Sequence, residues 1–253
     1  MHVTPNAQFT NVLKTIYYPE PTMDMSYERK IRILQCNIQR SISAAFILGN
    51  HLNNYDLVLL QEPYCRSNAP ACLPTYCPIL QGRRKYPWAV TLVPNVNLPI
   101  LHHTKFSDEC IIVTELLNND ERVIIINTYF PGEIDNDNFL GKLQHIIDAF
   151  QEAQIVLAGD LNAHSPAWGG NRLDGRGRQL EEFLNQNDLL LLNNPFSPLT
   201  FCSPRGESWI DVAICSSRLY AKITNWRVLP EESLSDHAYV TFNLIGKGNE
   251  DTI

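Results

Sequence analysis

Polar side chains recur where apolar stretches of this sequence end. The positions with this pattern are Asn37, Glu62, Tyr129, Asp160, Asn162, Asp211, Asp236 and His237. A carboxylate or amide beside a buried strand costs free energy unless it is paired or binds a metal. One such residue is usually structural, whereas several at successive strand ends indicate that the strands share one edge and assemble a single site.

The residue types at these positions favour a hard cation and proton transfer. Carboxylates and amides without a Cys₂His₂-type arrangement suit Mg²⁺, with Mn²⁺ as a substitute. A histidine next to an acid, as in Asp236-His237, suits proton transfer or contact with a phosphate near neutral pH. The sequence contains no P-loop, no Rossmann glycine pattern and no Gly-x-Ser-x-Gly motif, which argues against those chemistries.

The apolar patterns predict the elements that position these residues. Strands are expected over 31–38, 56–61, 88–93, 110–117, 121–130, 155–158, 189–192, 209–215, 223–229 and 239–244, and helices over 41–54, 136–150 and 179–186. Many strands with interspersed helices predict one α/β domain over residues 30–246, with two packed sheets flanked by helices. Residues 1–29 are expected to form an N-terminal tail, and residues 247–253 a C-terminal tail or linker.

Composition narrows the class of protein. The 253 residues are 44% hydrophobic and 19% charged, which is typical of a chain with a buried core. The net charge of -7 argues against a uniformly basic nucleic-acid coat but allows a local basic groove. No apolar run approaches the roughly 18 residues of a membrane-spanning helix, so no membrane association is expected. The odd number of cysteines and the absence of a secretory pattern predict a reduced, intracellular protein.

Six motifs follow one another along the chain: Ile33-Leu-Gln-Cys-Asn37, Leu59-Leu-Gln-Glu62, Asn127-Thr-Tyr129-Phe-Pro131-Gly, Gly159-Asp160-Leu-Asn162-Ala-His164, Trp209-Ile-Asp211-Val and Ser235-Asp236-His237. In this order they resemble the endonuclease/exonuclease/phosphatase superfamily, and the resemblance covers residues 31–245. Further motifs resemble the apurinic-type endonuclease domain of target-site-specific non-LTR retrotransposons, among them Asn162-Ala-His164-Ser-Pro-Ala-Trp168-Gly and Asp174-Gly-Arg176-Gly. The resemblance implies a four-layered α/β sandwich of two mostly antiparallel β-sheets flanked by helices.

The resemblance also implies an activity and partners. It suggests a Mg²⁺-dependent endonuclease that nicks double-stranded target DNA and leaves a 3′-hydroxyl for target-primed reverse transcription. A reverse transcriptase domain would then follow on the C-terminal side, and the protein would act in the nucleus. Two alternatives stay open: an abasic-site repair endonuclease or another phosphoesterase of the superfamily, and, from another class, an inactive DNA-binding module.

The metal-binding residues are assigned by the same resemblance. Glu62 matches the principal metal ligand of the superfamily, and Asn37 lies beside it in the metal and active-site shell. Asp236 matches a second acidic position near the metal. Superfamily mechanisms disagree over the number of metal ions and over the general base, and the sequence leaves both questions open.

The remaining site residues would handle the phosphate and the protons. Tyr129 matches the tyrosine that contacts the scissile phosphate, and Asn162 matches the asparagine that positions the phosphate and the neighbouring aspartate. Asp160 matches the aspartate that orients or deprotonates water or protonates the leaving oxygen. His237 would contact the phosphate or serve as the base, and Asp211 would orient it.

Three groups of basic residues are candidates for DNA contact. Arg83, Arg84 and Lys85 form a basic cluster next to two aromatic residues in a loop. Arg205 lies in an expected hairpin, where an arginine can enter a DNA groove. Arg176 follows the Asp160 motif and is a third candidate.

Overall fold

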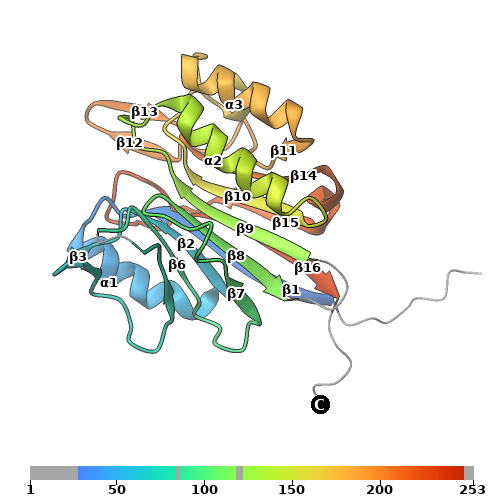
Figure 1. Cartoon of the computed structure of the whole chain (residues 1–253). Coiled ribbons are helices and arrows are strands. Elements are labelled where there is room, and N and C mark those ends of the chain that lie inside the picture. Colours follow the sequence, from blue (N-terminus) through green and yellow to red (C-terminus); the bar gives the residue numbers. More distant parts are fainter. Residues whose placement is uncertain (1–27, 84–85, 118–121, 248–253) are drawn as a thin grey trace, which may run out of the picture.

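A computed structural model describes residues 28–83, 86–117 and 122–247 of the chain. Two six-stranded sheets pack face to face, and helices cover their outer faces, which gives four layers (Figure 1). The expected four-layered α/β sandwich is therefore confirmed. The predicted terminal tails lie almost entirely outside the described residues, so their prediction stands untested.

Each sheet is antiparallel except for one parallel pair of strands. The first sheet has the order β15 (Ile223–Val228), β16 (Val240–Lys247), β1 (Glu28–Asn37), β2 (Leu57–Gln61), β6 (Ala89–Leu92) and β5 (Ile79–Leu80). The second has the order β11 (Leu189–Leu191), β14 (Asp211–Ser216), β10 (Gln154–Asp160), β9 (Arg122–Tyr129), β8 (Ile111–Leu117) and β7 (Ile100–His102). The parallel pairs are β1 with β2 and β9 with β10.

The main core lies between the two sheets, and alternation along the strands builds it. Ile33 on β1 and Leu59 on β2 face Ile125 on β9 and Ala158 on β10 across the sandwich. The neighbouring residue Leu34 points to the opposite face of its sheet, as period-two geometry requires.

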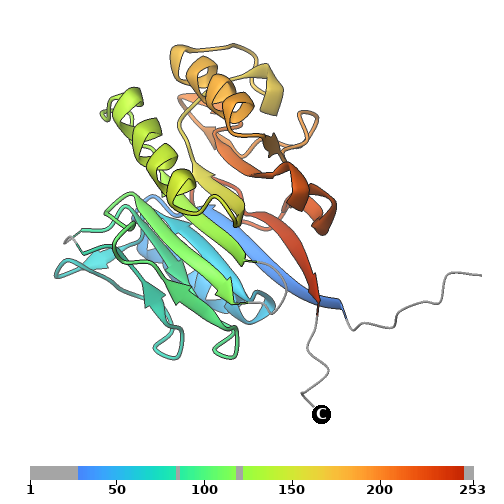
Figure 2. The same cartoon turned by 45° about the vertical axis from the view of Figure 1, so that its right-hand side comes forward.

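Three helices cover the outer faces of the sandwich. α1 (Ile42–His51) packs its buried side chains against the first sheet and is capped by Ser41, whose side chain accepts a hydrogen bond from the Ala44 amide. α2 (Asn136–Ala149) and α3 (Gly175–Gln186) lie together on the second sheet (Figures 1 and 2). In the described part of the chain, no helix is long and apolar enough to span a membrane.

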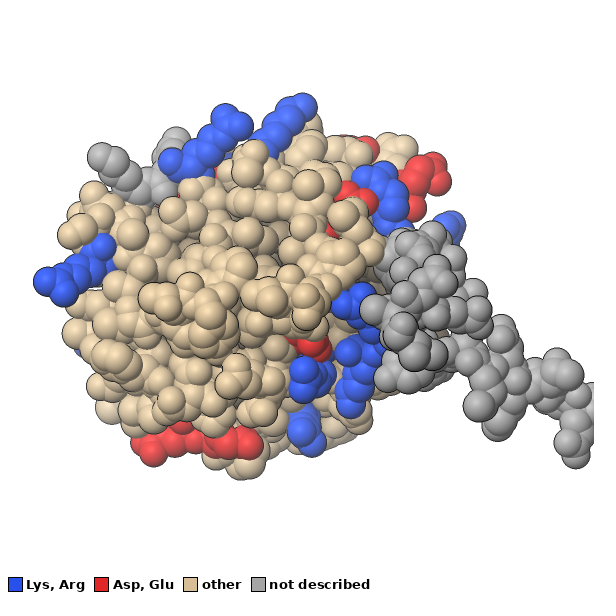
Figure 3. Space-filling view, turned by 90° about the horizontal axis from the view of Figure 1, so that it is seen from below, with Lys and Arg blue, Asp and Glu red and all other residues tan. Residues whose placement is uncertain are grey.

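Charge is unevenly distributed over the surface. The face seen from below in Figure 3 is broadly uncharged, with Lys, Arg, Asp and Glu side chains mainly around its margin. The sequence supplies the reason, because segments 41–55, 67–82 and 86–104 contain no Asp, Glu, Lys or Arg.

The structure differs from the predicted elements mainly in the loops. The hairpin of β12 (Phe201–Ser203) with β13 (Gly206–Ser208) confirms the one expected around Arg205, whereas the short hairpin of β3 (Cys65–Arg66) with β4 (Ala69–Pro70) and strand β7 were missed. Two- and three-residue strands are too short to show a period. α3 begins at Gly175, earlier than predicted, because Asp174 caps it by accepting a hydrogen bond from the Gly177 amide at 2.7 Å.

Candidate active site

The predicted site residues meet where the central strands of both sheets end. Asp160, the last residue of β10, pairs with Tyr129 at the end of β9 and with Asp211 at the start of β14. In the other sheet, Asn37 ends β1 beside the end of β2. The carboxyl ends of parallel strands point to the same edge, and the two parallel pairs therefore bring their terminal residues to one rim.

A glycine allows β10 to reach this rim. The strand was predicted to stop at Ala158, but its pairing with β9 continues through Asp160. A Cβ atom on Gly159 would lie 1.7 Å from the carbonyl oxygen of Thr128, so a larger residue would force the two strands apart. Asp160 is consequently held by a paired strand and not by a loop.

An open hollow of about 1430 Å³ lies over the rim. The predicted residues that line it are Glu62, Tyr129, Asp160, Asn162, Asp236 and His237. Residues of the β12–β13 hairpin, including Arg205, complete the wall. The hollow is larger than the roughly 300–1,000 Å³ of a small-molecule pocket, and its size suits a segment of a polymer.

Asp160, His237 and Asp211 form a buried line of titratable groups. Nδ1 of His237 lies 2.9 Å from Oδ2 of Asp211, and Nε2 lies 3.9 Å from Oδ2 of Asp160. Burial raises the pKa of Asp160 and the charge of Asp211 adds to the rise, against opposing effects of His237 and Asn37. Burial alone lowers the pKa of His237, but the nearby carboxylates, Asp211 foremost, raise it overall. A protonated imidazole therefore lies between two carboxyl groups, one of which readily takes up a proton.

Asn37 fixes the separation of two carboxylates. Its Nδ2 donates to Oε1 of Glu62 and to Oδ2 of Asp160, both at 2.9 Å. Its Oδ1 accepts the backbone N–H of Gln39 at 2.8 Å. The buried amide thus orients the two carboxylates and does not itself line the hollow, and the metal-shell role predicted for Asn37 stays a prediction.

Glu62 and Asn162 both have a left-handed backbone, each with φ of 46°. This region is uncommon for residues other than glycine, and such strain clusters at functional sites. Hydrogen bonds hold both conformations, because the Glu62 amide donates to the Trp88 carbonyl at 2.7 Å and the Asn162 amide donates to Oδ1 of Asp160 at 3.0 Å. The turns give both side chains a place in the lining of the hollow.

Tyr129 presents a neutral hydroxyl to the hollow. Burial raises its pKa well above the ordinary value, and the charges of Glu62 and Asp160 add to the rise. Its ring stacks on Trp88 with 5.3 Å between centroids and an interplanar angle of 11°. A neutral tyrosine so held can donate a hydrogen bond to an anion.

The donors in the hollow fit a hard cation. Among the described residues, no group of three or more His, Cys, Asp or Glu side chains could hold a metal ion by itself. Mg²⁺, however, commonly binds through one or two carboxylates, with water and substrate phosphates completing its shell. Glu62, which faces the open hollow, has the appropriate chemistry. Asp236 also lines it, and its Oδ2 accepts a hydrogen bond from Nε2 of Gln39 at 3.2 Å.

Comparison with known proteins finds similarity to proteins of retrotransposons and to endonucleases. A family model described as endonuclease-reverse transcriptase matches residues 123–241. The retrovirus-related Pol polyprotein from type-1 retrotransposable element R1 of Bradysia coprophila is 33% identical over 91 residues, which cover 33% of this chain. The matched part spans only 9% of that polyprotein. These matches support the resemblance of the chain to the endonuclease/exonuclease/phosphatase superfamily.

Two solved structures share the fold of this chain. The endonuclease domain of TRAS1, a telomere-specific non-LTR retrotransposon, superposes with a TM-score of 0.74 and 24% identity, covering 85% of this chain and 98% of that one. The AP endonuclease LMAP from Leishmania major superposes with a TM-score of 0.67 and 14% identity, covering 91% and 93%. At these identities the likeness concerns the fold.

The residues predicted to contact DNA lie in different surroundings. Arg205 lines the hollow on the β12–β13 turn, where its amide donates to Oγ of Ser203 at 3.1 Å. Arg83 is exposed but does not line the hollow, and Arg84 and Lys85 lie outside the described residues. Arg172 also lines the hollow.

Arg176 holds a loop beside the site. Its guanidinium donates to the carbonyl oxygens of Phe130 at 3.0 Å and Pro131 at 3.2 Å, and it stacks on the Phe130 ring at 3.7 Å. The Phe130 carbonyl also accepts a hydrogen bond from Nδ2 of Asn162. These contacts bind the loop after β9 and leave Arg176 out of the hollow's lining, although DNA contact was predicted for it.

Two residues that support the acid–base line were missed. Nε2 of Gln35 donates to Oδ1 of Asp211 at 3.4 Å, and the ring of Phe201 packs against His237 with 4.8 Å between centroids. Gln35 lies within an apolar strand, which is the signal that singled out Asp211. Phe201 gives no comparable signal, because its role depends on a contact between distant segments.

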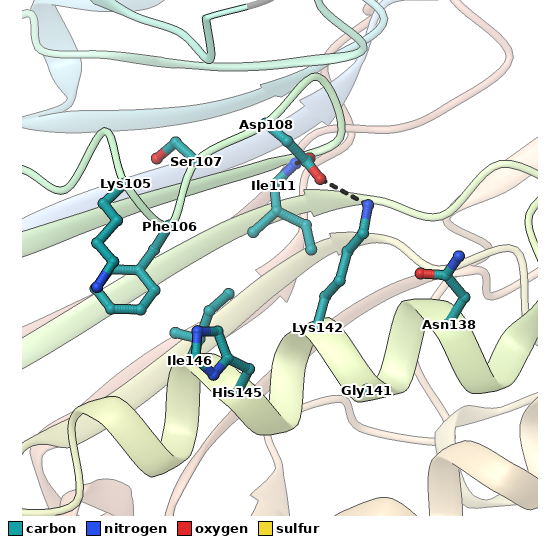
Figure 4. A pocket seen from close by; sticks show the side chains of 10 residues that line it. All are labelled: Lys105, Phe106, Ser107, Asp108, Ile111, Asn138, Gly141, Lys142, His145 and Ile146. Carbon is teal, nitrogen blue, oxygen red and sulfur yellow. Dashed lines mark hydrogen bonds and ion pairs between the residues drawn. The ribbon is translucent and has the colours of Figure 1, made fainter.

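A second, smaller hollow of about 400 Å³ lies between α2 and residues 105–111 (Figure 4). Its central pair is Nζ of Lys142 with Oδ2 of Asp108 at 2.7 Å. His145 and Lys105 lie at its margin. Because its one carboxylate is already paired with a lysine, this hollow lacks the line of acid–base groups that the larger hollow contains.

Proposed function

We propose that this chain is a metal-dependent endonuclease that nicks double-stranded DNA and leaves a 3′-hydroxyl. The observation that carries the proposal is the buried line of Asp160, His237 and Asp211, which shares one open hollow with Glu62. Hydrolysis of an anionic phosphodiester needs proton transfer and neutralisation of charge at the same place. The endonuclease descriptions of the family model and of the structural relatives support the same activity.

The protein's own groups divide the chemistry among them. Asp160, with its raised pKa, exchanges a proton with the attacking water or with the leaving oxygen. His237, kept protonated by Asp211, donates a hydrogen bond to a phosphoryl oxygen. The hydroxyl of Tyr129 and the side chain of Asn162 hold the phosphate in place, and their fixed positions amount to electrostatic preorganisation.

Glu62 would hold the metal, with Asp236 as a second acidic group at the same hollow. When bound there, Mg²⁺ or Mn²⁺ supplies charge neutralisation at a phosphoryl oxygen and at the leaving 3′-oxygen. Asn37 contributes by holding the Glu62 carboxylate at a fixed distance from Asp160.

The biological role is proposed from the relatives. One is part of a retrotransposon Pol polyprotein and another is the endonuclease domain of a telomere-specific non-LTR retrotransposon. By analogy, we assign this chain to the first cut of target-primed reverse transcription in the nucleus, with a reverse transcriptase domain on its C-terminal side. Arg205 on the hairpin is the candidate for reading the target sequence.

Incubation with supercoiled plasmid tests the proposal directly. With Mg²⁺ we expect conversion to open circles whose nicks a DNA polymerase extends, and with EDTA we expect none. Asp160→Asn serves as the inactive control. Nicks that carry a 3′-phosphate, or full activity in EDTA, would contradict the proposal. A plasmid containing abasic sites, run in parallel, would reveal a repair endonuclease by strong preference for those sites.

A further inference from the structure

The guanidinium of Arg40 lies over an aromatic ring beside the candidate active site. Its guanidinium carbon is 3.8 Å from the centroid of the Trp88 ring. The same indole stacks on Tyr129, whose hydroxyl belongs to the site. Trp88 therefore contacts both Arg40 and Tyr129, the residue that we expect to contact the scissile phosphate.

The backbone around Arg40 has a strained conformation. Gln39 and Arg40 have φ of 47° and 55°, in the left-handed region that glycine would occupy without strain. The Arg40 amide donates to the carbonyl of Glu62 at 2.8 Å, and α1 begins just after it with Ser41 as its cap. Because glycine would serve the turn better, the side chain of Arg40 calls for a reason of its own.

The charge of Arg40 is unpaired within the part of the chain that the structure describes. Arg32 and Arg122 each have a carboxylate partner at 3.0 Å and 2.7 Å, whereas Arg40 is exposed and makes no ion pair there. A guanidinium stacked on an indole keeps the N–H groups at its edge free, and their planar arrangement matches the oxygens of a phosphate.

We propose that Arg40, held on Trp88, binds a backbone phosphate of the DNA next to the scissile phosphate. This inference rests on the proposed nuclease function. The start of α1 and the β12–β13 hairpin lie on different sides of the rim (Figure 1), so the contact would be separate from that of Arg205. A phosphate contact carries no base information, and Arg40 would therefore set the register of the cleaved strand and not the choice of sequence.

Salt dependence of DNA binding tests the charge. The probe is a fluorescent duplex carrying a nick site mapped with the wild-type protein, titrated in EDTA across a salt series. Arg40→Gln should weaken binding roughly tenfold or more and reduce the slope of log K against log salt by about 0.9, as expected for one lost phosphate contact. Arg40→Lys should retain most of the slope. Arg218→Gln is the matched control. This exposed arginine follows the C-terminal end of β14, whereas Asp211 of the site lies at the N-terminal end of the same strand, so the substitution should change neither the affinity for DNA nor its salt dependence.

Neutral methylphosphonates placed one at a time in the duplex locate the contact. For the wild type, one substitution beside the nick should weaken binding, and for Arg40→Gln the same substitution should have no further effect. Additive effects at every position would overturn the inference. Thermal unfolding checks that each variant is folded. If Arg40→Gln does not fold, Arg40→Lys replaces it, and the methylphosphonate beside the nick should then weaken binding by Arg40→Lys less than it weakens binding by the wild type. If the wild type neither binds nor nicks the duplex, the proposed function itself fails, which distinguishes the two results.

Discussion

Asp160 and Asp211 are direct neighbours across antiparallel strands, and His237 lies between their carboxylates. Like charges opposite each other in a sheet destabilise it unless a cation intervenes. The protonated imidazole supplies that cation, and the hydrogen bond from Gln35 relieves Asp211 further. The acid–base groups are therefore coupled, and removal of one alters the charge of the others.

Asp160→Asn and His237→Ala should each abolish most nicking. Loss of general acid–base help alone costs roughly 10²–10⁴-fold in rate. The measurement is single-turnover nicking of supercoiled plasmid, with circular dichroism to check the fold. Cleavage at nearly the wild-type rate by either folded variant would remove that residue from the mechanism. Glu152→Gln, an exposed acid beyond α2, is a control that should leave the rate unchanged.

Glu62→Gln should raise the Mg²⁺ concentration required for half-maximal nicking. The substitution keeps the shape of the side chain but removes the charge that attracts the cation. A titration of rate against Mg²⁺ concentration measures the change, with Mn²⁺ as a second metal. An unchanged midpoint would show that Glu62 does not hold the metal.

Arg205→Ala should blunt preference among target sequences while the rate of the chemical step is preserved. The arginine lies on an exposed turn at the wall of the hollow, and one good base contact is worth roughly 1–3 kcal/mol of discrimination. Mapping nicks along one long duplex compares the variant with the wild type. Lys85→Ala should instead weaken binding alike on all sequences and lower its salt dependence. If Lys85→Ala altered the nick pattern and Arg205→Ala did not, Lys85 would be the residue that reads the sequence and Arg205 the one that contacts the phosphate.

Arg176→Met should destabilise the protein by about 1–3 kcal/mol, because it leaves several carbonyl oxygens of the loop after β9 without their donor. Urea unfolding measures this loss. The salt dependence of DNA binding should stay at the wild-type value. If Arg176→Met instead reduced the salt dependence of DNA binding and left the stability unchanged, the result would support the DNA contact that the sequence predicted for Arg176.

Glu115→Gln should lower stability at neutral pH but not in acid. The hydrogen bond from Arg122 lowers the pKa of Glu115 most, burial opposes it, and His103 adds to the lowering. A carboxyl group whose pKa is lower in the folded protein stabilises the fold at pH values above its pKa in the unfolded chain, which is about 4.3 for glutamate. This contribution is lost as the pH falls through the pKa of the group in the folded protein. We expect a difference of about 1 kcal/mol at pH 7, because water reaches Arg122 and screens the pair.

Urea unfolding at several pH values compares Glu115→Gln with the wild type. The difference should shrink below pH of about 4 and then vanish. A gap that stays constant across this range would mean that the ion pair does not cause it.

The strands that carry the site were predictable because their signal is local. Ile155 to Ala158 is apolar throughout, and polar residues follow it directly. The extension of β10 through Gly159 was not predictable, since it depends on the close approach of Thr128 on β9. The hairpin that holds Arg205 was predictable, but its position beside His237 was not, because it comes from a bridge between Phe201 and that histidine.

The sequence by itself determined which residues bring acid, base and amide groups to the strand ends, because residue type and period are properties of neighbouring positions. Only the tertiary structure decided what each cation and amide does. Arg176 faces carbonyls of the loop after β9, Arg40 lies on Trp88, and Asn37 turns its nitrogen to two carboxylates from different sheets. Long polar side chains take their roles from partners distant in sequence, and packing alone brings those partners within reach.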